Sequence, residues 1–174
     1  MTVYDSLNAA VRVVAAALLI YAAAQKLASP RSFRLTLTAL RVPRVKVVSA
    51  GVPVVELAAG FMLLSAPRFV LTASLVTGVG VAFAVAGALA LSRGTRVKCA
   101  CFGGADGGEL GVRQIVMLPL WSGVAALAWW APDGSPAGPE LGIGVMLALA
   151  VFAACKVVPL TRRNREYMQA MVPE

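Results

Sequence analysis

Histidine is absent from the 174 residues of this sequence, and only 8 residues are Asp or Glu. Without an imidazole, the chain has no histidine general base, no histidine metal ligand and no Ser–His or Cys–His pair to activate a nucleophile. Most hydrolytic chemistry is therefore not expected. Cysteine is also scarce, and the odd count of 3 leaves at least one thiol outside any intramolecular disulfide framework.

Charged residues make up only 14% of the chain, against about 25% in soluble domains. Hydrophobic residues make up 59%, and the mean hydropathy is +0.80. This composition predicts an integral membrane protein in contact with the lipid bilayer. The net charge of +8 would also suit a nucleic-acid binder, but the cations lie between apolar runs, as they do beside an anionic membrane surface. No nucleic-acid partner is expected.

Five apolar windows are long enough for a helix to cross a hydrocarbon core of about 30 Å. They fall near residues 9–27, 47–65, 69–92, 112–131 and 141–160. The sequence therefore predicts an all-α fold, a polytopic transmembrane bundle in a single integral membrane domain over residues 1–174. A cleaved signal is the alternative for the first window, but Asp5 precedes it and no Lys or Arg occurs before Arg12, which favours a retained helix.

The distribution of Lys and Arg predicts the orientation of these helices. Of the 16 cations, all but Arg12 and Arg68 fall in the first and third loops or at the C-terminal end. The positive-inside rule then predicts a multi-pass protein of the cell (cytoplasmic) membrane. Its N-terminus is expected outside and its C-terminus in the cytoplasm.

The first loop itself has a helical pattern. Ser29 and Pro30 are typical of a helix start, and the apolar residues Phe33, Leu37 and Leu40 recur at helical spacing. Arginines occupy the other faces. We expect a short basic interfacial helix over about residues 30–42, ending before the next proline.

Small residues form a stripe along the third window. Gly78, Gly80, Ala84 and Gly87 would let a neighbouring helix approach closely. This stripe predicts a helix-packing seam.

The densest chemical feature is the cysteine pair Cys99 and Cys101, just after the third window. The cations immediately before the pair are Arg93, Arg96 and Lys98. Such cations favour the thiolate, which is the nucleophile of thiol–disulfide exchange, and Gly103 would leave the sulfurs accessible. A disulfide across one residue closes a strained ring and so favours exchange over a structural role. Alternatively, both cysteines are small apolar residues at a helix end.

The third cysteine, Cys155, lies in the last window, near its cytoplasmic end in the predicted orientation. It could act as a resolving or relay thiol, although a free cysteine more often packs as a small hydrophobe. Three thiols could also bind a soft ion such as Cu(I) or Zn(II), but no fourth ligand is evident. No metal or other cofactor is expected.

Glu56 is the only acidic residue well inside a predicted span. Pro53, one turn earlier, should loosen the local backbone hydrogen bonds. An intramembrane carboxylate is a functional candidate, and its nearest plausible partner is Lys26 at the end of the first window. The pair could set the helix register or handle a proton, and the sequence leaves both open.

Short segments spread over roughly residues 15–120 together resemble a known family. They are Gln25-Lys26-Leu27, Phe33, Pro53-x-x-Glu56-Leu57, Leu63-Leu64, Phe83, Arg93-Gly94 and Cys99-Ala-Cys101-Phe-Gly103. The pattern is similar to the MauE/DoxX-like family of redox-associated membrane proteins. Carried over by position, the family's Cys-x-Cys-Phe-Gly falls on Cys99, Cys101, Phe102 and Gly103, its helix-one lysine on Lys26, and its helix-two Pro-x-x-Glu on Pro53 and Glu56.

The resemblance implies a DoxX-like core of four helices, to which this chain would add a fifth, C-terminal helix. It also implies a role like that attributed to MauE, which is to mature the small, disulfide-rich subunit of methylamine dehydrogenase. Relatives often accompany thioredoxin-like proteins, so such a protein is the partner that the resemblance implies.

Three functions follow from these patterns. The leading hypothesis is a membrane thiol–disulfide component in which Cys99 or Cys101 exchanges with a thioredoxin-like partner and assists a client protein. The second is a non-catalytic assembly factor or chaperone that holds its client through the bundle and the basic helix. The third, transport of a small solute at Glu56, is disfavoured because no paired, interrupted helices or internal repeat occur.

Overall fold

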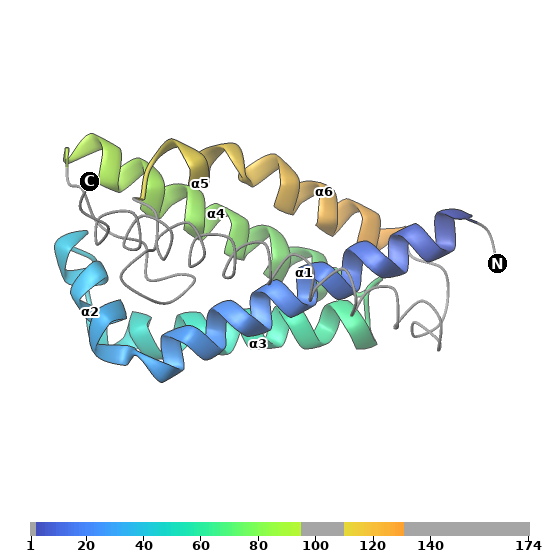
Figure 1. Cartoon of the computed structure of the whole chain (residues 1–174), viewed down its shortest axis with the longest axis horizontal. Coiled ribbons are helices and arrows are strands. Elements are labelled where there is room, and N and C mark those ends of the chain that lie inside the picture. Colours follow the sequence, from blue (N-terminus) through green and yellow to red (C-terminus); the bar gives the residue numbers. More distant parts are fainter. Residues whose placement is uncertain (1–2, 95–109, 131–174) are drawn as a thin grey trace, which may run out of the picture.

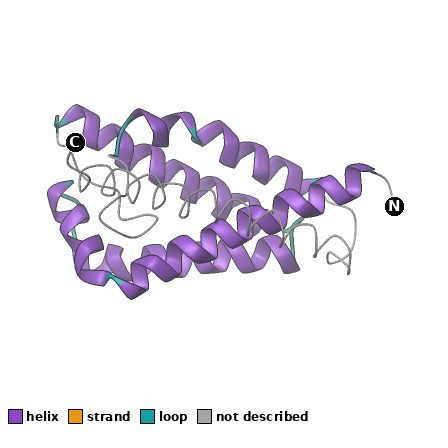
Figure 2. Cartoon of the chain, in the orientation of Figure 1, coloured by secondary structure: helices purple, strands orange, loops and turns teal. Residues whose placement is uncertain are grey.

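The computed structural model describes residues 3–94 and 110–130, which form an all-α helical bundle (Figure 1; Figure 2). In chain order the helices are α1 (Val3–Ala28), α2 (Pro30–Ala39), α3 (Val45–Ser65), α4 (Val70–Ser92), α5 (Val112–Val116) and α6 (Leu118–Trp129). Within these residues there is no strand, and the predicted all-α fold class is confirmed. The expected fifth crossing, residues 141–160, lies outside the described residues.

Four described segments are long and apolar enough to cross a membrane: Val3–Ala28, Val45–Ser65, Val70–Ser92 and Val112–Trp129. They coincide with the first four predicted windows and make this a multi-pass membrane protein. Helix α1 starts at Val3, earlier than the expected start near residue 9. The polar residues Asp5 and Asn8 shortened the apolar window, but an acid in the first turn suits the helix dipole. Nδ2 of Asn8 donates a hydrogen bond to the Leu127 carbonyl oxygen, 2.7 Å away.

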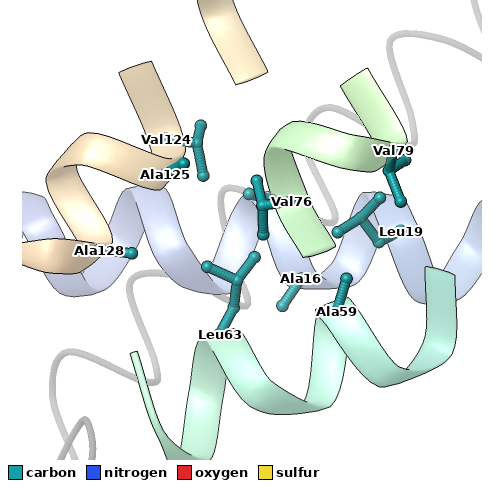
Figure 3. Close-up of a cluster of buried hydrophobic side chains, with 10 residues drawn as sticks. Ala16, Leu19, Ala59, Leu63, Val76, Val79, Val124, Ala125 and Ala128 are labelled. Carbon is teal, nitrogen blue, oxygen red and sulfur yellow. The ribbon is translucent and has the colours of Figure 1, made fainter. Parts of the chain in front are cut away.

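The four spans pack as a closed ring of neighbours. Helix α1 lies beside α3, α3 beside α4, and α4 beside α5 and α6, while α6 returns to α1. In Figure 1, α1 and α3 run together along one edge of the bundle, and α4 runs with α5 and α6 along the other. Figure 3 shows the shared core, which includes Ala16, Leu19, Ala59, Leu63, Val76, Val79, Val124, Ala125 and Ala128. Most of these side chains are small, so dispersion contacts between closely approaching helices stabilise the bundle.

Two glycines of the predicted seam mark where α4 meets its neighbour. A Cβ built on Gly80 would lie 2.7 Å from Cβ of Trp121, and one on Gly87 would lie 2.6 Å from the Gly111 carbonyl oxygen. Ala84 lies between them and is buried. These contacts confirm the seam. Gly78 does not belong to it, because this residue is exposed and a Cβ there would have no atom within 4 Å.

The matched variants Gly80→Ala and Gly78→Ala test this seam. We expect Gly80→Ala to destabilise the bundle by about 1–3 kcal/mol, because the added methyl group pushes α4 away from Trp121. Gly78→Ala should be neutral or stabilising by up to about 1 kcal/mol, since alanine is the better helix former. Thermal unfolding in one detergent measures both. Equal midpoints for the two variants would contradict the close approach.

Proline divides the fourth predicted span. The expected continuous helix over 112–131 is α5 followed by α6, with Met117 between them. Pro119 has no N–H to donate to the carbonyl four residues earlier, and its ring clashes with that carbonyl. The two helices still make up one candidate span, Val112–Trp129.

Helix α2 forms where a short basic helix was expected, and it lies across one end of the bundle (Figure 1). Its apolar residues Phe33 and Leu37 are buried, as is Leu40 just beyond it, which confirms the apolar face. The helix ends at Ala39 rather than near residue 42. The reason is that Arg41 has a φ of 48°, in the left-handed region that a right-handed helix cannot include. Ser29 precedes the helix but makes no side-chain capping bond.

Candidate functional site

A buried ion pair joins α1 and α3. The ammonium nitrogen Nζ of Lys26 lies 2.8 Å from Oε1 and 2.9 Å from Oε2 of Glu56, so one cation contacts both carboxylate oxygens. Lys26 is 2% exposed and Glu56 is 0% exposed. The contact expected between these two residues is therefore present. Each charge is neutralised by the other, which is what allows them to remain inside an apolar bundle.

Lys26 points into the bundle although it lies one turn from the end of α1. Side chains on a helix tilt toward its N-terminus, so a long side chain near the end of α1 leans back over the preceding turn. In addition to its contacts with Glu56, Nζ accordingly donates a hydrogen bond to the Ala22 carbonyl oxygen, 3.4 Å away. A lysine at such a position could otherwise extend to the interface. The inward orientation brings Nζ to the carboxylate of Glu56.

Two aromatic rings complete the surroundings of the ammonium group. Nζ of Lys26 lies 5.6 Å from the ring centroid of Phe33 on α2 and 5.5 Å from that of Phe83 on α4. Both distances are within the roughly 6 Å range of cation–π attraction, which is strongest for a desolvated cation. Four helices, α1 to α4, therefore meet at one ammonium group. Phe33, Phe83 and Glu56 lie far apart in the sequence, and only the fold brings them together.

Helix α3 passes through Pro53 without a break. Pro53 is buried, and it lies one turn before Glu56. Its ring nitrogen cannot donate to the carbonyl of Ser49, so one backbone hydrogen bond is missing beside the ion pair. The predicted local loosening is thus limited to this bond, and α3 keeps Glu56 in register with α1.

The end of α4 is tied to α2 near the ion pair. Nη1 of Arg93 donates a hydrogen bond to the carbonyl oxygen of Leu40, immediately after α2. The Leu40 side chain packs in a small cluster with Ala90 of α4 and Leu110. The chain therefore leaves the described region at Gly94 and returns at Leu110 beside the same helix, α2. The predicted exchange residues Cys99, Cys101, Phe102 and Gly103 lie between these points, outside the described residues, as does Cys155.

The opposite end of the bundle holds polar residues that the sequence did not single out. Arg12 falls within the first predicted window, toward its outer end, and the structure shows it as a buried residue of α1, 1% exposed. Its Nε donates to the Leu63 carbonyl at 3.0 Å and its Nη2 to the Leu64 carbonyl at 3.4 Å. The last carbonyls of a helix lack helical partners and carry partial negative charge, so Arg12 caps α3. Arg12 and the buried Ala16 are four residues apart and so share one face of α1. This spacing is the sequence signal that could reveal the buried position of Arg12.

The described residues show what this architecture can do chemically. No group of three or more His, Cys, Asp or Glu side chains lies close enough together in residues 3–94 and 110–130 to hold a metal ion. What they do hold is a compact polar contact in an apolar bundle, fixed on every side. This contact joins α1 to α3, with the rings of Phe33 on α2 and Phe83 on α4 beside it.

Comparison with known families shows to which family this chain belongs. The model of the family described as Methylamine utilisation protein MauE matches residues 4–131, well over half of the chain. This chain belongs to the MauE family. Comparisons with curated proteins and with solved structures give no match.

Some of the candidate residues lie inside the MauE match and others lie outside it. Its range includes the ion pair, both aromatic rings and the pair Cys99 and Cys101, whereas Cys155 and the window 141–160 lie beyond it. Cys155 therefore lies outside the part of the chain that carries the family match. The matched range also contains the four described spans almost completely, in keeping with a four-helix core.

Proposed function

We propose that this MauE-family protein is a membrane thiol–disulfide redox component that assists the maturation of a disulfide-bearing client or supplies it with electrons. Cys99 and Cys101 are the exchanging thiols, and a thioredoxin-like dithiol protein is the electron donor. The observation that carries the proposal is that this Cys-x-Cys pair lies within the family match, in a segment bounded on both sides by residues beside α2. The family description supports a membrane protein associated with methylamine utilisation.

The proposed exchange conserves electrons and protons. A thiolate of the donor attacks one sulfur of the Cys99–Cys101 disulfide and forms a mixed disulfide. The donor's second thiolate displaces that sulfur, so the donor leaves as a disulfide while the pair takes up two electrons and becomes a dithiol. The reduced pair then repeats the sequence on a client disulfide, which leaves as a dithiol while the Cys99–Cys101 bond reforms.

The described bundle supports this role as a scaffold. Five residues span at most about 18 Å, so Cys99, which follows Gly94 by that number, acts near the α2 end in this proposal. The Lys26–Glu56 pair holds α1 and α3 together there, and Phe33 joins α2 to the same contact. In this proposal Lys26 and Glu56 are positioning residues, and they take no part in the transfer of electrons.

A trapping experiment tests the proposal. In a Cys101→Ser variant, attack by Cys99 on a partner disulfide has no resolving thiol, so a mixed disulfide should accumulate and should disappear on addition of a reductant. The reciprocal Cys99→Ser variant shows whether Cys101 can attack instead. A Cys99→Ser, Cys101→Ser variant is the control and should form no adduct. If neither single variant gives a reducible adduct with a disulfide-bearing client, thiol exchange is excluded and a non-catalytic assembly factor is the better account.

A further inference from the structure

The two ends of the bundle differ in charge. The end that carries α2 has a group of exposed cations within a short stretch, Arg31, Arg34, Arg41, Arg44 and Lys46, which we call the basic patch. The one described carboxylate at this end of the bundle is Glu56, which is buried and already paired with Lys26. At the other end the described ionisable side chains include both signs, with Asp5 near the start of α1 and Arg68 between α3 and α4. The charge of the basic patch is therefore uncompensated by the described part of the chain.

The basic patch faces away from the bundle. Helix α2 turns Phe33 and Leu37 inward, so Arg31 and Arg34 lie on its exposed side. The turn that follows α2 holds Arg41 at φ 48°, where arginine is less stable than glycine or asparagine. The turn itself thus has no need of this side chain. What Arg41 adds at this position is a guanidinium group beside those of α2.

The position of the basic patch favours a lipid as its partner. Helix α1 ends at Ala28 and α3 begins at Val45, so the patch lies where two membrane spans end. Leu35 is 70% exposed on α2 between the arginines. An apolar side chain among cations suits the boundary between headgroups and acyl chains, where both kinds of group are satisfied. Guanidinium groups bind phosphate oxygens through paired hydrogen bonds.

We propose that the basic patch binds the headgroups of anionic phospholipids in the membrane that the bundle spans. The arginines contact the phosphate oxygens, and Leu35 enters the upper acyl region. This proposal is independent of thiol exchange, since it uses none of the cysteines. It assigns to α2 a second contact, with lipid on its outer face and with the Lys26–Glu56 pair on its inner face.

Lipid binding by the full-length protein tests the proposal. The detergent-purified, delipidated chain is titrated with phosphatidylglycerol or with phosphatidylcholine of the same acyl chains, and bound lipids are counted by native mass spectrometry. We expect several-fold stronger binding of phosphatidylglycerol. An Arg31→Gln, Arg34→Gln, Arg41→Gln variant should lose about tenfold or more in affinity for phosphatidylglycerol, because each cation near an anionic surface contributes to attraction. Its affinity for phosphatidylcholine should not change.

Two controls keep the result interpretable if that variant folds poorly. A variant with lysine at the same three positions keeps the charge and should keep most of the preference for phosphatidylglycerol. For the unaltered protein, raising the salt concentration should weaken the preference, since exposed charges are screened. Equal binding of the two lipids by the unaltered protein would overturn the proposal. Competition by inorganic phosphate alone at similar concentration would also overturn it, because the lipid would then be unnecessary for binding. So would a glutamine variant that retains the preference, because the basic patch would then be unnecessary.

Discussion

Replacing both Cys99 and Cys101 with serine is expected to abolish disulfide-dependent maturation of the client. Serine hydroxyls cannot form or exchange a disulfide, so electron transfer through this pair should stop completely rather than become slower. The measurement is the fraction of client with its native disulfides, read on non-reducing gels from cells that produce both proteins. The loss should be complete to the background level of cells without the chain.

The matched control for this experiment is Cys155→Ser. Cys155 lies outside the MauE match, and we expect this variant to mature its client normally. Membrane levels of both variants should equal that of the unaltered protein, which separates lost chemistry from lost folding. A double variant that still supports maturation would contradict thiol exchange and would favour an assembly factor that acts without its cysteines.

Removing either member of the buried ion pair is expected to destabilise the bundle severely. Lys26→Met leaves the Glu56 carboxylate without its cation, and Glu56→Leu leaves the ammonium among apolar atoms and two rings. An uncompensated buried charge costs about 3–5 kcal/mol. The midpoint of unfolding in mixed micelles, measured for both single variants, reports this cost.

The double variant Lys26→Met, Glu56→Leu gives the more informative result. With both charges removed, the desolvation cost disappears, and the remaining side chains are apolar and of similar size. We therefore expect the double variant to be more stable than either single variant, so the two effects should be far from additive. Lys46→Met is the control, because Lys46 is exposed and its replacement should change stability by less than about 0.5 kcal/mol. Additive losses in the double variant would show that the two residues do not act as a pair.

The sequence predicted the spans well because a bilayer imposes a length and a composition on any helix that crosses it. It also predicted the contact between Lys26 and Glu56, since a lone carboxylate inside a span needs a cation within reach. The ends of the helices were harder to predict from the sequence. The start of α1 was predicted too late because its first turns contain polar residues. The effect of Pro119 on the fourth span depends on whether the backbone can bend there.

Contacts between distant helices account for the rest of what the sequence missed. The sequence places Arg12 in the first span but gives no partner for it, because the carbonyls at the end of α3 meet the guanidinium group only when α3 packs beside α1. Phe33 and Phe83 carry part of the family resemblance, but no spacing rule brings both rings to Lys26. Register between helices depends on close packing at small residues such as Gly60 and Gly80, and single-sequence patterns do not specify that register.

The most direct test of the central claim is the redox state of Cys99 and Cys101 in the unaltered protein, read by differential alkylation and mass spectrometry. Incubation with a thioredoxin-like dithiol should convert the two residues together from a disulfide to two alkylatable thiols, and a disulfide-bearing client should reverse the change. Two thiols that stay reduced and unreactive under both conditions would contradict the account.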